Sequence, residues 1–277
     1  MAARSILITG CSSGIGADCA VFLREHGWRV FASCRAEADC ARLRTAGFEA
    51  PRIDYEDEAS IASGLAEVLE TTGGTLDALF NNGAYAIPSA VEDLPRAALR
   101  QNLEANLLGY HDLTRRVIPV MRAQGHGRIL NCSSVLGFAA LRWRGSYNTT
   151  KFALEGLSDT LRLELRGTGI HVVLIQPGPI ATEIRRNSIP PFERWIDWEA
   201  SALRELYATT LLKRLYDAPT GPDPFERQPR AVSKKVLRAL TAARPASRYK
   251  ITTPTYAMAV LRRVLPRRTL DNLLARL

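Results

Sequence analysis

Tyr147 and Lys151 have residue types and a spacing that suit proton transfer. They lie four residues apart in the segment SYNTTK, so at the start of a helix they share one face. A nearby ammonium favours the phenolate, so we expect it to lower the tyrosine pKa from its usual value of about 10. Ser134 lies thirteen residues before the tyrosine, just past a predicted strand. The three residues predict general acid–base chemistry.

A glycine-rich turn near the start of the chain suits a phosphate. The segment TGCSSGIG at residues 9–16 follows a short apolar run and opens an amphipathic helix. Glycines permit a tight turn and a close approach of the backbone, and a helix N-terminus presents free N–H groups to a pyrophosphate. The turn therefore predicts a dinucleotide site.

The end of the second predicted strand, VFASCR at 30–35, bears on the choice of dinucleotide. An NAD site has an acidic residue about 20 positions beyond the glycine turn, which bonds the ribose 2′-hydroxyl. Here Cys34 brings no negative charge, and Arg35 can bond a 2′-phosphate. We therefore expect at least a tenfold preference for NADP(H). The alternative is that Arg35 is an ordinary solvated arginine.

Strand-like and helix-like segments alternate along the chain and position these residues. Short apolar runs predict strands at 5–9, 29–33, 76–80, 128–132 and 171–176, with a last one at 248–252. Helical spacing is found at 14–26, 95–124 and 147–166. This alternation predicts an α/β fold, a doubly wound and mostly parallel sheet of the Rossmann type.

Four of the predicted strands end in glycine-rich or polar residues. These ends are Gly10, residues 81–83, residues 133–134 and residues 177–178. Ligands of such sheets bind beyond the carboxyl ends of the strands, where helices on opposite faces part. The four ends therefore predict a cofactor crevice at one edge of the sheet.

The domain organisation follows from composition and rhythm. Residues 1–254 are expected to form a single Rossmann-type catalytic domain, and residues 183–229, rich in proline, aromatic and charged residues, an insertion that covers the substrate cleft. The C-terminal segment 255–277 reads as two short amphipathic helices separated by Pro266.

The positive charge belongs to the end of the chain. Residues 231–277 carry 11 Lys and Arg and one acidic residue, a net charge of +10. Residues 1–230 have a net charge of −1, which gives +9 for the whole chain. A basic amphipathic segment suits the surface of an anionic membrane. Packing of its apolar faces on the domain or on a partner subunit is the alternative, and both stay open. Nucleic-acid binding is not expected, because the body is near neutral.

Several classes of protein are disfavoured. The chain has no apolar stretch of about 18 residues, which disfavours a membrane-spanning helix, and no apolar signal segment before the first predicted strand. Its five cysteines are scattered without zinc spacing, which predicts reduced thiols and a cytoplasmic protein. The four histidines lack ligand spacing, so no metal site is expected.

Five ordered motifs resemble those of the short-chain dehydrogenase/reductase family, in its single-domain branch. TGxxxGIG at 9–16 matches the cofactor turn, NNGA at 81–84 is similar to NNAG, and PGPIAT at 177–182 matches PGxxxT. Ser134 with YxxxK at 147–151, and Asn106 in ANLLG, match the catalytic residues. The resemblance covers residues 4–182, and the surroundings are most similar to hydroxysteroid and retinol dehydrogenases.

The resemblance implies a role for each matched residue. Tyr147 would exchange the proton of the alcohol, Lys151 would hold the nicotinamide ribose, Ser134 (preferred to Ser133 by spacing) would bond the substrate oxygen, and Asn106 would position a water. The residues implied or expected to bind the cofactor are Gly10, Ser13, Gly14, Ile15, Gly16, Arg35, Asp54, Asn82, Tyr147, Lys151, Pro177, Ile180 and Thr182.

These patterns predict an NADP(H)-dependent oxidoreductase that interconverts a hydrophobic secondary alcohol and a ketone, or a retinal-like aldehyde. Aromatic residues, among them Trp143, Phe192, Trp195 and Trp198, are expected to form a hydrophobic substrate wall, with core or lid packing as the alternative. The competing function is a protein of the same fold that binds NADP(H) without turnover; an epimerase or dehydratase fits the motifs less well. A homo-oligomer is implied by family analogy alone.

Overall fold

The structure is a computed structural model that describes residues 3–218 and 221–275. In this part, six strands form one sheet in the order β2-β1-β3-β4-β5-β6, and every neighbouring pair is parallel. The strands are β1 (Ser5–Ile8), β2 (Arg29–Ala32), β3 (Ala78–Asn81), β4 (Gly127–Cys132), β5 (Ile170–Pro177) and β6 (Arg248–Ile251). The predicted doubly wound sheet is confirmed, with its order reversing between β1 and β3.

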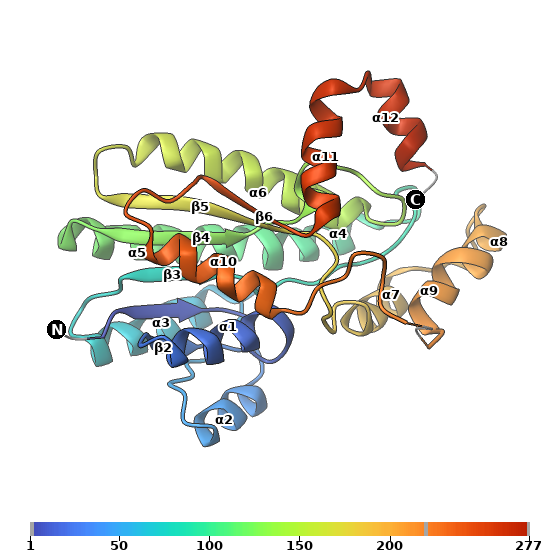
Figure 1. The fold of residues 1–277 in the computed structure, drawn as a ribbon. Coiled ribbons are helices and arrows are strands. Elements are labelled where there is room, and N and C mark those ends of the chain that lie inside the picture. The colour runs from blue at the N-terminus through green and yellow to red at the C-terminus, as the bar shows by residue number, and fades with distance from the viewer. Residues whose placement is uncertain (1–2, 219–220, 276–277) are drawn as a thin grey trace.

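Twelve α-helices are found among the described residues; some lie on either face of the sheet and others lie beyond the carboxyl ends of its strands (Figure 1). They are α1 (Gly14–Glu25), α2 (Glu37–Thr45), α3 (Glu58–Thr72), α4 (Arg96–Leu103), α5 (Gly109–Gln124), α6 (Gly145–Glu164), α7 (Ile189–Trp195), α8 (Arg204–Leu206), α9 (Leu212–Tyr216), α10 (Arg230–Thr241), α11 (Thr253–Val264) and α12 (Arg267–Leu274).

The core has two halves because successive residues of a strand point to opposite faces. In β1, Ile8 packs on the side of α1 and α10, with Leu23 and Val236. Its neighbour Leu7 packs on the other side with Val117 of α5. The apolar runs read from the sequence are buried on both faces for this reason.

A further extended segment lies outside β2. Glu49 bridges Phe31, and Arg52 bridges Cys34, both in parallel orientation. The chain thus runs alongside β2 before it reaches Asp54. This short parallel segment, which the sequence reading did not predict, brings Asp54 and Arg52 to the same edge as the end of β2.

The helix predicted over 95–124 is two helices joined by a π turn. Helix α4 ends at Leu103, the π turn runs over Glu104–Leu108, and α5 begins at Gly109. A π turn carries one residue more than an α turn, so it changes which side chains face the sheet. A Cβ at Gly109 would lie 2.4 Å from Cβ of Tyr55, so the glycine permits this close approach.

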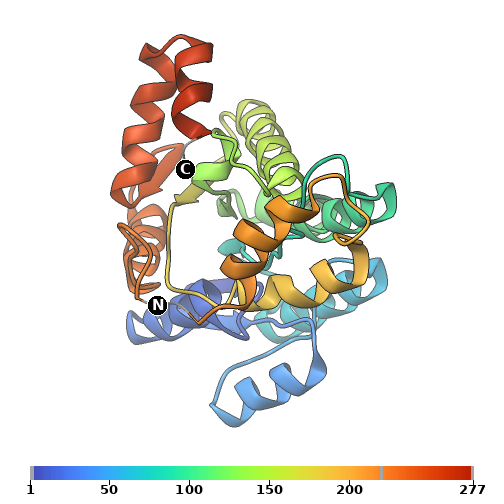
Figure 2. The ribbon, with the colours of Figure 1, turned by 90° about the vertical axis from the view of Figure 1, so that its right-hand side faces the viewer.

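Residues 183–229 contain α7, α8 and α9 and build a hydrophobic cluster of their own. Its buried members include Phe192, Tyr207 and Leu211, and Ile87 and Ala98 of the main body join it. The segment lies at the carboxyl ends of the strands, which Figure 2 views from the front. It is packed against the loop after β3 and against α4.

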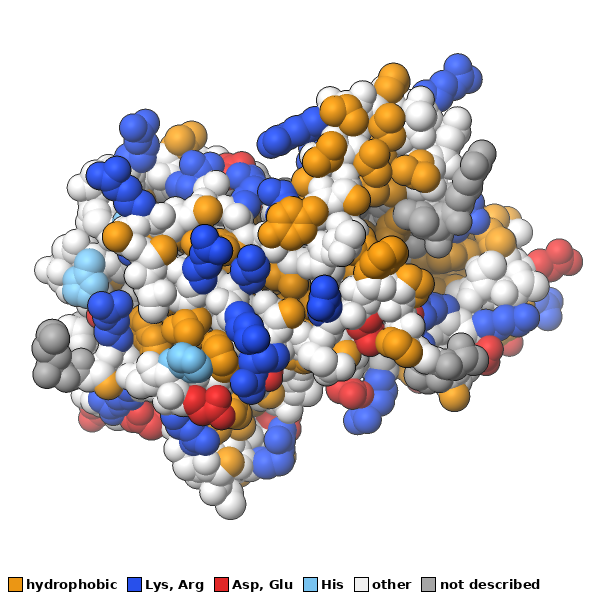
Figure 3. Space-filling model, in the orientation of Figure 1, with side chains coloured by type: hydrophobic (Ala, Val, Ile, Leu, Met, Phe, Trp, Pro, Cys, Tyr) orange, Lys and Arg blue, Asp and Glu red, His pale blue; other side chains and the backbone are white. Residues whose placement is uncertain are grey.

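The C-terminal helices α11 and α12 meet the main body through one of their faces. Met258 and Leu270 are buried against Phe138 and Ala139, in the loop that follows Ser134. The opposite side of α11 carries exposed apolar side chains (Figure 3), namely Tyr256, Val260 and Val264. Packing on the domain therefore accounts for part of the amphipathic pattern and leaves a second apolar stripe uncovered.

Candidate active site

The carboxyl edge of the sheet brings together most of the predicted site residues. Gly10 follows β1, Asn82 follows β3, Ser134 follows β4, and Thr182 follows β5. A Cβ on Gly10 would lie 2.4 Å from Cα of Gly83, so the ends of β1 and β3 are in contact. Figure 2 shows α8 and α9 on one side of this edge and α11 and α12 on the other.

Tyr147 lies in the first turn of α6, where its side chain is half-buried. Burial raises the pKa of Tyr147 above its ordinary value; hydrogen bonding to Ser134 and the charge of Arg144 lower it by less. The expectation that Lys151 lowers this pKa below its usual value is therefore wrong, because desolvation outweighs the neighbouring charges. The phenol is protonated at neutral pH.

Ser134 begins a short 3-10 turn after β4 and points toward the same region. Its Oγ accepts a hydrogen bond from the backbone N–H of Leu136 at 3.1 Å. This contact uses an acceptor position of the hydroxyl and leaves its proton free to be donated. The neighbouring Ser133 is only 2% exposed, and a Cβ added at Gly137 would lie 2.5 Å from its Oγ, so it lies within the loop packing.

Lys151 is buried one helical turn after Tyr147. Its Nζ donates a hydrogen bond to the carbonyl of Cys132 at 2.7 Å and lies 5.4 Å from the centre of the Tyr147 ring. Burial lowers the pKa of Lys151 to about 8. The Cys132 carbonyl is the one hydrogen-bond acceptor of this ammonium among the described residues, so two of its three N–H groups remain for a ligand.

Asn106 lies in the π turn, and its side chain holds the loop after β3. Its Oδ1 accepts from the N–H of Tyr85 at 3.1 Å, and its Nδ2 donates to the carbonyl of Tyr85 at 2.8 Å and to Oγ1 of Thr150 at 3.3 Å. The amide thereby joins this loop to α6 next to Lys151. Positioning of a water by Asn106 stays a prediction.

The glycine turn is held to the end of β3 by Asn82. Its Nδ2 donates to the carbonyls of Thr9 and Gly10 at 3.0 and 3.4 Å. A Cβ at Gly16 would lie 2.2 Å from the carbonyl oxygen of Gly10, so the tight turn requires glycine there. Gly14, with φ +58°, meets Thr182, whose side chain would lie 3.1 Å from an added Cβ. The glycine turn and the loop after β5 therefore face each other.

The N-terminus of α1 has the features of a phosphate site. Ser13 is its N-cap residue and makes no capping hydrogen bond through its side chain, and the first turn holds no acidic residue. Ile15 and Ile180 both pack against the same core cluster. Pro177 ends β5. These residues lie where the resemblance implies, and their contact with a dinucleotide remains a prediction.

Arginines gather at the end of β2. Arg35 is exposed, and its carbonyl accepts a hydrogen bond from Nε of Arg52 at 3.0 Å. Arg42 in α2 donates to the carbonyl of Ser12 in the glycine turn at 2.9 Å. The sequence reading missed Arg42, because only folding brings α2 against the turn. Asp54 is half-buried and its Oδ1 accepts from the N–H of Glu56, so it caps its own loop.

Cys34 is buried rather than facing a ligand through an exposed thiol. It is 1% exposed, and burial raises its thiol pKa to about 12. The side chain is neutral at physiological pH. It therefore brings no charge beside the arginines, as the sequence reading required.

The aromatic residues expected to form a substrate wall pack in the cluster of residues 183–229. Phe192 is 1% exposed, and the ring centre of Trp143 lies 4.7 Å from that of Tyr207. Nε1 of Trp195 donates to Gln101 at 3.0 Å. Phe192 is therefore a core residue, which favours the packing alternative for it.

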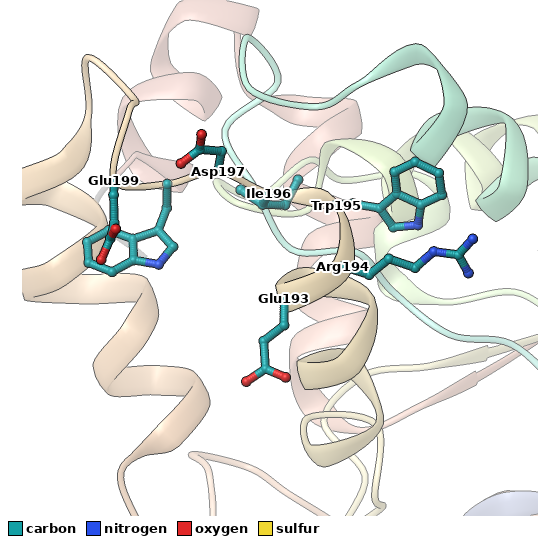
Figure 4. Close-up of a pocket in the computed structure, with 7 residues that line it drawn as sticks. Glu193, Arg194, Trp195, Ile196, Asp197 and Glu199 are labelled. Carbon is teal, nitrogen blue, oxygen red and sulfur yellow. The ribbon is translucent and has the colours of Figure 1, made fainter.

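A depression of about 380 Å³ lies on the outside of this segment (Figure 4). Its lining comes from the end of α7 and the residues after it, Glu193 to Glu199. None of the predicted catalytic or cofactor residues borders it. The depression is therefore separate from the site predicted at the strand ends.

Within residues 3–218 and 221–275, no group of three or more His, Cys, Asp and Glu side chains could hold a metal ion. No helix in the same part is long and apolar enough to cross a membrane.

Residues 4–191 match the family described as short chain dehydrogenase. The chain belongs to the short-chain dehydrogenase family. It is 37% identical to the uncharacterized oxidoreductase YbbO of Escherichia coli K12, over 98% of this chain and 94% of that protein. It is 28% identical to bovine (Bos taurus) retinol dehydrogenase 8, over 96% of this chain and 86% of that protein. As a member of the family, it is an oxidoreductase.

Solved structures of family members have the same fold. A short-chain dehydrogenase from Burkholderia phymatum in complex with NAD matches with a TM-score of 0.78 at 24% identity, covering 99% of this chain and 95% of that one. A short-chain dehydrogenase from Burkholderia cenocepacia in complex with NADP matches with a TM-score of 0.74 at 22% identity, covering 98% and 97%. The two structures thus share the fold of this chain, one of them in complex with NAD and the other with NADP.

Proposed function

We propose that this short-chain dehydrogenase is an NADP(H)-dependent enzyme that interconverts a hydrophobic secondary alcohol and a ketone, or a retinal-like aldehyde. The observation that carries the proposal is the arrangement of Tyr147, Ser134 and Lys151 at the carboxyl end of β4. A protonated phenol, a hydroxyl with a free proton and a buried ammonium face one region. Such a set can protonate a carbonyl oxygen and stabilise charge on it.

The buried ammonium also supports a bound cofactor. A desolvated charge with a single protein acceptor is costly unless a ligand supplies more partners. The two remaining N–H groups of Lys151 suit the hydroxyls of a ribose. The uncapped N-terminus of α1 suits the pyrophosphate. When bound, the nicotinamide supplies the hydride, while the protein orients the reactants and handles the proton.

In the direction of reduction, Tyr147 donates its phenolic proton to the carbonyl oxygen as the C–H bond forms. Ser134 donates a hydrogen bond to the same oxygen. Lys151 holds the ribose and, as a cation next to the ring of Tyr147, stabilises the phenolate that is left. In the direction of oxidation, the phenolate removes the proton of the alcohol.

The preference for NADP(H) is supported by charge at the end of β2. Arg42 reaches Ser12 of the glycine turn while paired with Asp39 at 2.9 Å, Arg35 is exposed at the end of β2, and Cys34 brings no negative charge. A guanidinium binds a phosphate through two N–H groups. We expect that the double variant Cys34→Asp/Arg35→Ser shifts the ratio of kcat/KM from NADPH toward NADH by at least tenfold. A wild-type enzyme that uses both equally well contradicts the assignment.

The choice of a hydrophobic substrate is supported by the surroundings of the site. Apolar side chains remain exposed on both flanking segments, for example Ile184 and Leu273. Similarity to a protein named retinol dehydrogenase supports the same substrate class. A panel of steroids, retinoids, medium-chain ketones and quinones, each tested with NADPH and NADH, identifies the class.

The catalytic assignment is tested by Tyr147→Phe. This change keeps the ring and removes only the exchangeable proton, so turnover should fall by about 10²–10⁴ while NADPH binding stays within about twofold. Nicotinamide absorbance gives the rate, and NADPH fluorescence gives the affinity. If Tyr147→Phe keeps more than about a tenth of the rate, the proton is donated by another group. NADPH binding by the wild type without any turnover supports the competing regulatory function.

We further propose that the stripe Tyr256, Val260 and Val264 contacts an anionic membrane surface. These residues lie at intervals of four on α11 and are each more than half exposed (51%, 59% and 65%). Arg262 and Arg263 lie beside them, and the excess of positive charge in this part of the sequence suits anionic lipid. The other face of α11 and α12 packs on the loop after Ser134, so attachment brings the active site close to the bilayer.

A further inference from the structure

We propose that Tyr110 is a positioning residue for Lys151. Its ring lies against the ammonium, holds it in place and favours its charged form, from which Lys151 serves Tyr147 and the ribose. The role in catalysis rests on the proposed function, whereas the contact between the two side chains does not. Neither the sequence patterns nor the family motifs single out Tyr110.

The geometry places the ammonium between two aromatic rings. Nζ of Lys151 lies 5.2 Å from the centre of the Tyr110 ring and 5.4 Å from that of Tyr147. Both distances fall within the range of about 6 Å over which a ring face attracts a cation. The Cys132 carbonyl at 2.7 Å completes the protein contacts of Nζ that the structure describes. Because Lys151 is 1% exposed, water screens these contacts little.

The fold also holds the Tyr110 ring through contacts other than Lys151. Tyr110 is the second residue of α5, directly after the π turn, so its direction depends on the extra residue of that turn. The ring of Tyr55 packs on it with 4.9 Å between centres. The hydroxyl of Tyr55 is itself held by Thr9 and Asn81, each at 2.7 Å. The ring therefore has little freedom to move away from the ammonium.

The ring of Tyr110, and not its hydroxyl, carries this role. The side chain is 1% exposed, and its hydroxyl has no hydrogen-bond partner among the described residues. A buried hydroxyl without a partner lowers stability. Replacement by phenylalanine should therefore leave the protein at least as stable as the wild type and keep the contact with the ammonium.

On its own helix, Lys151 is followed by Glu155, whose Oε2 is paired with Arg248 at 3.1 Å. The charge of Glu155 also raises the pKa of Lys151, although no ion pair joins the two side chains among the described residues. The thiol of Cys132 on β4 is neutral at physiological pH, because burial raises its pKa. Tyr147 is protonated for the same reason. Burial works against the ammonium and lowers its pKa to about 8, so the Tyr110 ring is a neighbour that offsets this loss.

The lysine content of the chain permits a direct test in the free protein. Lys151 is one of only five lysines, with Lys213, Lys234, Lys235 and Lys250. In protein labelled with ¹³C-lysine, the Cε signal of Lys151 is assigned by its loss in Lys151→Arg, and its titration gives the pKa. The other four signals provide internal controls.

The matched variants are Tyr110→Phe and Tyr110→Leu. Tyr110→Phe should leave the pKa of Lys151 within about 0.3 units, and Tyr110→Leu should lower it by about 0.5–1 unit, a three- to tenfold change in the ionisation constant. The sign follows because loss of the ring destabilises the protonated form. Equal shifts in the two variants, no shift in Tyr110→Leu, or an upward shift overturns the proposal. If Tyr110→Leu does not fold, Tyr110→Met serves as the variant without a ring.

Kinetics separates this inference from the proposed function. With an active wild type, Tyr110→Leu should weaken NADPH binding and shift the pH profile of kcat/KM downward, while Tyr110→Phe retains both. An inactive wild type whose Lys151 still titrates as described refutes the proposed function and leaves the contact intact. An active wild type in which Tyr110→Leu leaves NADPH affinity and the pH profile unchanged refutes the positioning role alone.

Discussion

Replacement of Asn106 tests whether its amide is a structural brace for the loop after β3. The side chain is completely buried and accepts from the N–H of Tyr85 while donating to its carbonyl. In Asn106→Ala the carbonyl of Tyr85 keeps a second donor, Nδ2 of Asn102 at 3.0 Å, but the N–H loses its partner. An N–H left without a partner in this part-buried contact costs about 1–3 kcal/mol.

This cost corresponds to a fall in Tm of roughly 2–12 °C, at about 2–4 °C per kcal/mol for chains of similar size. Thermal unfolding followed by circular dichroism measures it, and Asn272→Ala, at an exposed position of α12, is the control, with an expected effect within about 0.5 kcal/mol. A Tm for Asn106→Ala within 1 °C of this control would refute the reasoning.

Asn106→Asp refines the same test. The carboxylate can still accept from the N–H of Tyr85, but its second oxygen then faces the Tyr85 carbonyl, where Nδ2 now lies at 2.8 Å. Two acceptors cannot share that contact, so the ionised variant should be at least as unstable as Asn106→Ala. Protonation restores a donor. The deficit relative to the wild type should therefore shrink as the pH falls, and a deficit independent of pH contradicts the assigned hydrogen bonds.

Three further outcomes are expected. Gly10→Ala should destabilise the protein by several kcal/mol and abolish NADPH binding, because the φ of Gly10 is +68° and the new Cβ meets the Gly83 backbone. The control Gly27→Ala, at φ +81° with open space around it, should cost only about 1–2 kcal/mol. Equal costs of the two variants in chemical denaturation contradict the close approach at Gly10. Val260→Ser with Val264→Ser should weaken co-sedimentation with phosphatidylglycerol vesicles at low salt; a wild type that does not bind such vesicles refutes the membrane proposal. Hydrogen bonding to Asp77 raises the pKa of His126 in the folded protein. The pair therefore stabilises the fold below the unfolded pKa of about 6.5, and this stability is lost as the pH rises through the folded pKa. In urea titrations, His126→Gln should cost up to about 0.5 kcal/mol at pH 6 and nothing at pH 9, since the pair is largely exposed.

The sequence by itself determined the fold class and predicted where the site lies. Runs such as Ser5–Ile8 and Ile170–Pro177 are buried along nearly their whole length. A continuous apolar run predicts this, because a strand covered on both faces has apolar side chains on both. The spacing of Tyr147 and Lys151 is local to one helix, so their common face follows from helical geometry alone. Polar residues at strand ends marked the edge, because carboxyl ends of parallel strands necessarily coincide.

Only the tertiary structure decided the properties that depend on contacts between distant segments. The direction of the Tyr147 pKa shift is set by burial under surrounding elements, and the spacing to Lys151 gave the opposite sign. Arg42 reaches the glycine turn, and Tyr110 reaches Lys151, across gaps of 30 and 41 positions in the chain. The helical period of 95–124 did not predict the π turn at Glu104–Leu108, which changes the direction of the side chains that follow it. Hydrophobic periodicity predicts which face of a helix or strand is buried, but the segment that buries it depends on tertiary packing.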